Sequence, residues 1–235
     1  MTPFYIRDGG GDTAYLEGEE ALHSTKVLRK KVGDEILGVD GKGQMLLCRV
    51  SALGKGLVEL EILERHRDWG EKPQRISILV SPLHKPDRLE WLIEKSVELG
   101  VTDIYPYLGK HTVKTGLRAD RLERIMIAAL KQCMRSQLPK LHTAAPLKAA
   151  LAGLEAEVRL IATAEAKQHT QDLPVDWVMA PSAAILVGPE GDFSQEELDL
   201  AIGNRFQSVS LGQNRLRSET AAIHLLGLVK NFMRY

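Results

Sequence analysis

The sequence lacks several features that would place it in other classes of protein. Only two cysteines, Cys48 and Cys133, occur among its 235 residues, and they lie far apart without the spacing of metal ligands. A disulfide framework and a zinc site are therefore not expected, and a reducing, cytoplasmic compartment fits best. No apolar run approaches the roughly 20 residues of a membrane-spanning helix. The first residues also lack the basic-then-apolar order of a signal peptide.

An excess of charge of one sign is also missing, because 31 Lys and Arg balance 31 Asp and Glu. The whole chain is thus not a polycation that coats nucleic acid, although a local basic face is compatible with this balance. Two nucleotide-binding signatures are absent as well. No Gly-x-Gly-x-x-Gly follows a predicted strand and no Walker lysine loop occurs, so phosphate binding at a glycine-rich loop is not expected.

The first 68 residues are predicted to form a small β-rich unit. Turn signals rich in Gly and Asp separate three short strand-like runs, at 35–40, 45–50 and 57–62. The polar stretch 65–73 contains Gly and Pro and has no periodicity. We interpret it as a linker, which sets the first unit at 1–68, the linker proper at about 69–74 and the second unit at 75–235.

A short helix is predicted over residues 23–34 of the first unit, ending near Gly33. It carries four cations, Lys26, Arg29, Lys30 and Lys31. Such a run is most often a solvated helix face. The functional alternative is a patch that contacts the phosphates of a nucleic acid.

The second unit alternates between strand and helix patterns. Strands are predicted at 76–81, 101–106, 158–163, 183–188 and 206–211. Helices are predicted at 87–99, 118–137, 146–154, 194–202 and 218–233. This alternation predicts an α/β fold with a mainly parallel sheet that is covered on both faces. Ligands of such sheets bind beyond the carboxyl ends of the strands.

Two glycine-containing loops fall at that edge of the sheet, at 185–193 and at 209–222. Each follows an apolar run and leads into a helix, so together they can enclose a small molecule. The first loop alone also fits an ordinary turn, with Ser194 and Glu197 as a capping box of the next helix. The second is harder to explain as a turn, because Arg215 and several other polar residues cluster where the last helix begins.

The motifs in these loops resemble those of the ribosomal RNA small subunit methyltransferase E family. They read Gly-Pro-Glu-Gly-Asp-Phe-Ser at 188–194 and Leu-Gly-x-x-Arg-Leu-Arg-Ser-Glu-Thr-Ala at 211–221. The resemblance extends to His-x-x-x-Val-Leu-Arg at 23–29 and to the charged pattern at 85–101. Ordered motifs at matching spacing across both units are more specific than either loop alone.

The resemblance implies a PUA-like β-barrel at 1–68 that binds RNA, followed at 75–235 by a SPOUT-type parallel sheet with a deep trefoil knot. It also implies a homodimer that binds S-adenosylmethionine and methylates N3 of one uridine in 16S ribosomal RNA within the small subunit. No metal is implied. The residues implied to bind the cofactor are Thr163, Leu186, Val187, Gly188, Pro189, Glu190, Gly191, Leu211, Gly212, Leu216, Thr220 and Ala221.

Two residues are expected to act on the uracil. Arg217 is expected to lie against the negative charge that develops on the uracil carbonyls when N3 loses its proton. Glu219 is expected to orient Arg217 or to accept the proton, and its structural alternative is stabilisation of the helix N-terminus. The predicted RNA contacts are Lys26, Arg29, Lys30, Lys31, Lys85, Arg88 and Arg135.

The sequence departs from the family pattern at residues 110–113, Lys-His-Thr-Val, where many relatives have a Ser-Glu-Arg-Ser-like segment. One arginine of the second loop is also displaced to Arg215. Three other functions remain open at this point. They are ribose 2′-O-methylation by a SPOUT enzyme, a non-catalytic RNA-binding assembly factor and, with less support, a small-molecule transferase.

Overall fold

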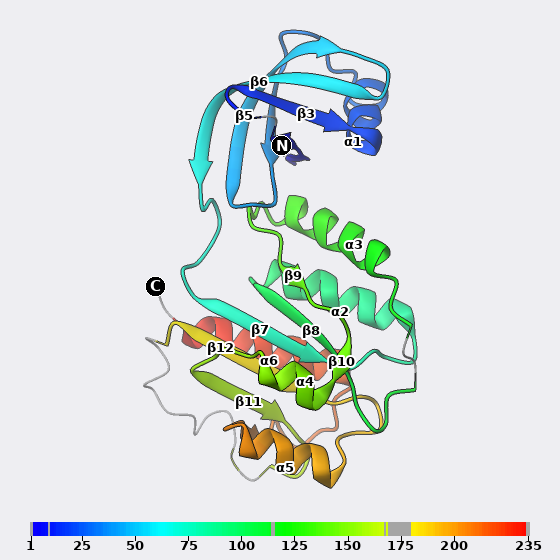
Figure 1. Cartoon of the computed structure of the whole chain (residues 1–235), viewed down its shortest axis with the longest axis vertical. Coiled ribbons are helices and arrows are strands. Elements are labelled where there is room, and N and C mark those ends of the chain that lie inside the picture. Colours follow the sequence, from blue (N-terminus) through cyan, green and yellow to red (C-terminus); the bar gives the residue numbers. More distant parts are fainter. Residues whose placement is uncertain (1, 9, 114–115, 167, 169–179, 234–235) are drawn as a thin grey trace. The chain divides into compact units, whose positions relative to one another are not determined.

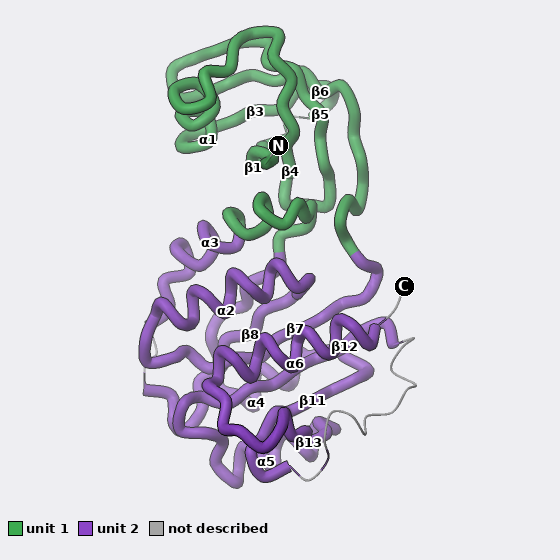
Figure 2. Tube along the Cα trace, turned by 180° about the vertical axis from the view of Figure 1, so that it is seen from behind, with its two compact units in different colours: residues 1–71, 127–138 green, residues 72–126, 139–235 purple. Residues whose placement is uncertain are grey.

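The computed structural model describes residues 2–8, 10–113, 116–166, 168 and 180–233. The chain forms two compact units (Figure 2). The first contains residues 1–71 and 127–138, and the second contains residues 72–126 and 139–235. The sequence-based division was contiguous, whereas the contacts of residues 127–138 group them with the first unit.

A six-stranded sheet forms the body of the first unit, in the order β1-β4-β5-β6-β3-β2. Its strands are β1 (Phe4–Tyr5), β2 (Arg7–Asp8), β3 (Thr13–Glu17), β4 (Glu35–Val39), β5 (Gln44–Leu53) and β6 (Leu57–Arg67). The two edge strands, β1 and β2, are separated in the chain by Ile6 alone. The sheet therefore curls into a nearly closed barrel. Its core contains Ile6, Leu16, Leu46 and Leu60, each 1% exposed or less.

The helical segment of this unit is α1 (Gly18–Leu22), continued by a π-helical turn over His23–Val27. The predicted helix at 23–34 was thus wrong in both bounds. It could not continue to residue 34, because Arg29 and Gly33 have φ values of 53° and 95°, in the left-handed region that interrupts a right-handed helix. β6 runs through Arg67, so the first residues of the polar stretch 65–73 belong to a strand.

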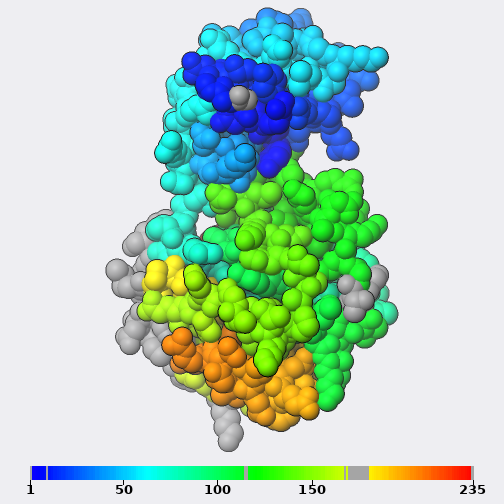
Figure 3. Space-filling model, viewed as in Figure 1, coloured from blue at the N-terminus to red at the C-terminus, as the bar shows by residue number. Residues whose placement is uncertain are grey.

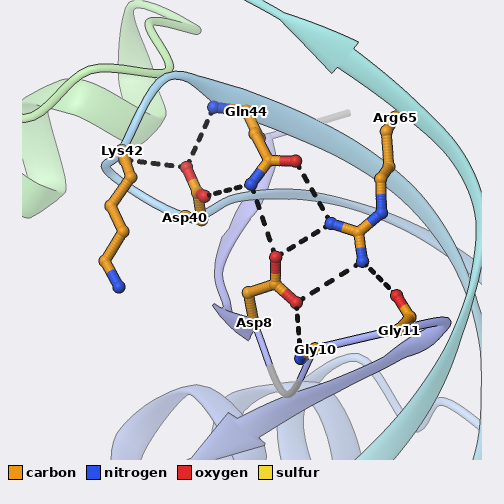
Figure 4. Close-up of polar contacts among 7 residues, drawn as sticks. All are labelled: Asp8, Gly10, Gly11, Asp40, Lys42, Gln44 and Arg65. Carbon is orange, nitrogen blue, oxygen red and sulfur yellow. Dashed lines mark hydrogen bonds and ion pairs between the residues drawn. The ribbon is translucent and has the colours of Figure 1, made fainter.

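A polar network joins β2 to β5 and β6 on the first unit (Figure 4). The guanidinium of Arg65 donates to Asp8 at 2.8 Å and to Gln44 Oε1 at 3.1 Å, and also to the carbonyl of Gly11. Gln44 Nε2 in turn donates to Asp40 at 2.9 Å. The hydrogen bond from Arg65 lowers the pKa of Asp8, outweighing the opposing effect of burial. These bonds hold the short β2 strand against the long strands.

Residues 127–138 join the first unit through Glu71 and the β4–β5 hairpin. The Glu71 carboxylate accepts from the Arg135 guanidinium at 2.8 Å and from the backbone N–H of Ser136 at 2.9 Å. The backbone N–H of Gly43 donates to the carbonyl of Ser136 at 3.0 Å. Met134, with φ of 58°, turns the chain just after the preceding helix. The predicted helix at 118–137 therefore ends earlier, at Gln132.

The second unit contains a parallel sheet in the order β10-β8-β7-β12-β11-β13, with β9 also paired to β8. Its strands are β7 (Arg75–Val80), β8 (Asp103–Leu108), β9 (Lys140–Leu141), β10 (Ala145–Pro146), β11 (Val158–Ala162), β12 (Ser182–Val187) and β13 (Gln207–Val209). Every strand pair in it is parallel, as the alternation predicted. The central strands are almost fully buried, which explains their continuous apolar runs.

Helices cover both faces of this sheet. They are α2 (Pro86–Glu98), α4 (Leu147–Ala152), α5 (Gln195–Gly203) and α6 (Ser218–Phe232), whereas α3 (Ala119–Gln132) has residues in both units. Figures 1 and 2 show α4 and α5 on one side and α2 and α6 on the other. On the face seen in Figure 3, α5 forms a continuous surface in orange beside the green residues around α4. The two layers leave the carboxyl ends of β11, β12 and β13 open to a ligand.

No helix within the described ranges is long and apolar enough to cross a membrane.

Candidate active site

A cavity of about 600 Å³ lies at the carboxyl ends of β11, β12 and β13. Three strand-end segments form it, and they begin at Thr163, Gly188 and Ser210. The predicted cofactor residues that line it are Thr163, Val187, Gly188, Pro189, Glu190, Leu211, Gly212, Leu216 and Ala221. Residues that sequence reasoning did not select also line it, namely Ala162, Ala164, Asp192, Ser210, Gln213, Asn214, Arg215 and Ser218. Both glycine loops thus line the same cavity.

The loop after β12 folds back on itself at Gly188. A Cβ at this position would lie 3.1 Å from the ring of Phe193, so a larger residue would force that ring to shift. Phe193 is 8% exposed and belongs to the core beneath the loop, where its ring stacks on that of Tyr107. Asp192 has φ of 61° and accepts from the N–H of Phe193 at 2.8 Å. The tight turn is therefore required for the packing of Phe193.

The predicted capping box at the start of α5 is confirmed. Ser194 accepts from the backbone N–H of Glu197, and the Glu197 carboxylate accepts from the N–H of Ser194 at 2.8 Å. Glu197 also accepts from the backbone N–H of Lys110 at 2.9 Å. Burial alone would raise the pKa of Glu197, but the hydrogen bonds from Ser194 and Lys110 lower it overall. The ionised carboxylate thus joins the loop after β8 to the start of α5.

Residues 110–113, which differ from the family pattern, pack against the first glycine loop from outside the cavity. His111 Nδ1 lies 3.0 Å from the carbonyl oxygen of Asp192, and a Cβ at Gly191 would lie 3.0 Å from the Cβ of His111. Thr112 Oγ1 lies 2.7 Å from Ser81 Oγ at the end of β7. The sequence drew attention to this segment by its departure but did not reveal that it packs against the loop.

Glu190 connects the cavity to the loop after β7. Its carboxylate accepts from the backbone N–H of His84, at 3.1 and 3.3 Å for the two oxygens. Because this contact involves a backbone group, no side-chain pattern in the sequence could have indicated it. Glu190 therefore has a positioning role in addition to lining the cavity.

The loop after β13 brings two arginines to the cavity. Gly212 has φ of 121°, which disfavours any residue with a Cβ. Arg215 and Arg217 both line the cavity and are exposed. Arg217 is the N-cap residue of α6, and its carbonyl accepts from the N–H of Ala221 at 2.8 Å. The start of α6 thus fixes the backbone from which the Arg217 side chain extends.

Three predicted cofactor residues lie outside the cavity lining. Leu186 is fully buried in the core of the sheet, because alternate residues of a strand point to opposite faces. Gly191 faces His111, as described above, and Thr220 is exposed on the first turn of α6. These three residues belong to the sequence motifs but do not line the cavity.

Glu219 also differs from its prediction. It does not line the cavity, and it faces Arg88 on α2, with 3.6 Å between Arg88 Nε and Glu219 Oε1. The Glu219 side chain is 9% exposed, and its Oε2 has no hydrogen-bond partner among the described residues. The carboxylate therefore joins α6 to α2 and lies outside the lining of the cavity. The same contact engages Arg88, which was predicted to bind RNA.

The other predicted RNA contacts differ in exposure. Lys26, Arg29 and Lys31 are exposed on the first unit. Lys30 is half-buried and donates to the carbonyl of Glu35 at 3.0 Å. On the second unit, Lys85 is exposed at the N-terminus of α2.

Arg135 was wrongly assigned to the RNA surface. It is 5% exposed, and its guanidinium binds the Glu71 carboxylate within the first unit. An arginine that is buried against a carboxylate stabilises the fold and is not presented to a nucleic acid.

Comparison with known proteins identifies the class of this fold and site. A sequence model described as "RNA methyltransferase domain" matches residues 70–230, and one described as "RNA methyltransferase PUA domain" matches residues 16–63. The chain is therefore a two-domain protein of the RNA methyltransferase class. It is 30% identical over 220 residues to ribosomal RNA small subunit methyltransferase E of Rickettsia conorii, covering 92% of this chain and 88% of the relative. The chain belongs to the ribosomal RNA small subunit methyltransferase E family.

Other relatives and solved structures agree with this assignment. The enzyme of the same name from Mycobacterium bovis is 28% identical over 231 residues, which cover 93% of this chain and 86% of the relative. A probable rRNA-methyltransferase from Porphyromonas gingivalis superposes with a TM-score of 0.89 at 30% identity, over 99% of this chain and 98% of that one. The Neisseria gonorrhoeae enzyme bound to S-adenosylmethionine gives a TM-score of 0.85 at 29% identity, with coverage of 99% and 98%.

Proposed function

We propose that this protein transfers the methyl group of S-adenosylmethionine to N3 of one uridine of 16S ribosomal RNA in the small subunit. The observation that carries this proposal is the meeting of both glycine loops, Thr163 and Arg217 at one cavity. Relatives that align with more than 90% of this chain carry the name of a small-subunit ribosomal RNA methyltransferase.

The cavity fits S-adenosylmethionine in size and in chemistry. Its volume of about 600 Å³ lies within the usual range for small-molecule sites. Apolar Val187, Leu211 and Leu216 suit the faces of an adenine ring, and the close turns at Gly188 and Gly212 let backbone groups approach the ligand. When bound, the cofactor supplies an electrophilic methyl group on a sulfonium. The backbone of the two glycine loops would hold it.

The chain's own contribution to the reaction is positioning and electrostatics. Uracil N3 carries a proton at neutral pH, so the site has to favour the uracil anion. Arg217, a cation at the rim of the cavity, would stabilise the negative charge on the uracil carbonyls. Glu219 supports Arg217 indirectly, because its contact with Arg88 holds the first turn of α6 against α2. Alignment of the acceptor with the methyl group would supply much of the rate.

We extend the proposal to the finer features of the family. The nearly closed barrel of the first unit acts as a PUA-like RNA-binding domain, with Lys26, Arg29, Lys30, Lys31 and, on the second unit, Lys85 as contacts. The second unit contains a trefoil knot and forms a homodimer. The protein works in the cytoplasm, where ribosomal subunits are assembled. The target base is extruded from its stack before it enters the cavity.

Methyl transfer can be tested with small ribosomal subunits from a strain that lacks the enzyme, a labelled donor and mass spectrometry of the nucleosides. We expect label in 3-methyluridine. Label in a ribose would instead support 2′-O-methylation, and saturable cofactor binding without transfer would support an assembly factor.

The role of Arg217 can be tested in the same assay. Arg217→Ala should lower transfer by a factor of about 100 or more and leave cofactor binding measurable by calorimetry. Arg124→Ala is a matched control, because Arg124 is an exposed arginine that pairs with Asp120 on α3 and does not line the cavity. Normal turnover in Arg217→Ala would remove Arg217 from the mechanism.

A further inference from the structure

A second hollow lies on the second unit, between the loop after β7 and the start of α3. It has a volume of about 300 Å³. Its floor is apolar, because Leu83, Leu89 and Leu122 are 1%, 6% and 4% exposed. The other lining residues are Pro82, Pro86, Glu90, Gly116, Leu117, Arg118 and Arg121. None of these residues lines the first cavity, and the proposed methyl transfer gives the hollow no role.

A carboxylate fixes two arginines at the rim of this hollow. Both oxygens of Glu90 accept from Arg121, one from Nε and one from Nη2, and the second of these bonds is 2.6 Å long. Arg118 Nη2 lies 3.9 Å from the same carboxylate. The hydrogen bond from Arg121 lowers the pKa of Glu90, which keeps the carboxylate ionised. Two guanidinium groups against one carboxylate leave an excess of one positive charge at the rim.

A hydrogen bond connects the loop beside the second hollow to the lining of the first cavity. Leu83 and Pro86 line the second hollow, and His84 lies between them in the chain. The backbone N–H of His84 donates to Glu190, which lines the first cavity. The loop 82–86 thus lines the second hollow and is also hydrogen-bonded to a residue that lines the first cavity, which makes the two sites neighbours.

We propose that the second hollow receives a nucleobase adjacent to the target uridine in the RNA. Extrusion of the target base leaves its neighbour without a stacking partner. The base has two apolar faces, which suit the leucine and proline floor, and its nucleotide carries a charged phosphate, which suits the positive charge of Arg118 and Arg121. The exposed Arg118 guanidinium can stack on a base or bind a phosphate, whereas Arg121 uses Nε and Nη2 to bind Glu90 and so adds its charge. This inference rests on the proposed function, and it assigns to these arginines a role in substrate binding.

The contribution of the two arginine charges to RNA binding can be measured with Arg118→Ala and with the double variant Arg118→Ala/Arg121→Ala. Arg118 is 70% exposed, so its replacement should not affect folding, and thermal unfolding of both variants verifies this. We expect the KM for small ribosomal subunits to rise about threefold in the single variant and about tenfold in the double variant. In both variants, kcat and cofactor affinity should change less than about twofold. Arg124→Ala removes the same charge from the same helix outside the hollow and should change KM less than about twofold. An unchanged KM in the double variant would overturn the inference.

The position of the base can be tested independently of charge. A benzophenone amino acid replacing Leu117 places a photoreactive group in the lining of the hollow. Irradiation with small subunits should crosslink it to 16S RNA within about two nucleotides of the methylated uridine. Crosslinks to distant RNA would overturn the inference. Crosslinks to a ribosomal protein would also overturn it and would identify the occupant of the hollow as a peptide. If the wild-type protein methylates no uridine at N3, the proposed function itself fails, and this outcome is separate from the crosslinking result.

Discussion

The contact between Arg88 and Glu219 gives the sharpest test of how the second unit is held together. Arg88→Ala should lower the free energy of unfolding of this unit by about 2–3 kcal/mol. Removing one partner of a buried ion pair costs about 3–5 kcal/mol, because the other charge stays buried without compensation. The expected loss lies below this range, because the Arg88 side chain is 26% exposed and the separation of 3.6 Å exceeds that of a hydrogen bond.

Urea titration and thermal unfolding can measure this loss. For a chain of this length the change corresponds to a fall in Tm of about 4–12 °C. The double variant Arg88→Met/Glu219→Gln should recover most of the stability, because it leaves no buried charge. Arg124→Ala breaks a pair whose side chains are 66% and 76% exposed, so its effect should stay below about 0.5 kcal/mol. An Arg88→Ala variant as stable as Arg124→Ala would refute the reasoning.

Two further predictions concern the first unit. Burial raises the pKa of the Cys48 thiol to about 12, so iodoacetamide at about pH 8 should label Cys48 only after unfolding, as peptide mass spectrometry can show. Rapid labelling of the native protein would contradict this. The Arg65 hydrogen bond lowers the pKa of Asp8 below its ordinary 3.8. Its stabilising effect is therefore present above that value and is lost as the pH falls through the folded-state pKa. Urea titrations across the acid range should show Asp8→Asn losing less stability than the wild type on acidification, and parallel losses would argue against this role for Asp8.

The sequence was sufficient to predict the elements of the second unit because its periodicities are strong. Buried strands such as β7 and β12 are continuous apolar runs, and α5 begins with a capping box formed by Ser194 and Glu197. The short strands β9 and β10, of two residues each, were missed because two residues show no periodicity. The parallel alternation also placed both glycine loops at one sheet edge, where they line one cavity.

Side-chain direction could not be predicted in the same way. Glu219 and Arg217 are two residues apart, yet one is buried toward α2 and the other lines the cavity. This difference follows from the packing of α6 on α2, which depends on contacts distant in the sequence. Arg135 was misassigned for a similar reason, since its partner Glu71 lies 64 residues away. Motif position thus identified the site region but not the role of each side chain.

The grouping of residues 127–138 with the first unit has a consequence for how the protein forms. A fragment ending at residue 71 would lack the donors that Glu71 binds and the carbonyl that Gly43 reaches. During synthesis, these contacts can therefore form only after residues 72–126 of the other unit have been translated. A cut after residue 71 would remove this set of bonds, although every strand of the six-stranded sheet lies within residues 4–67.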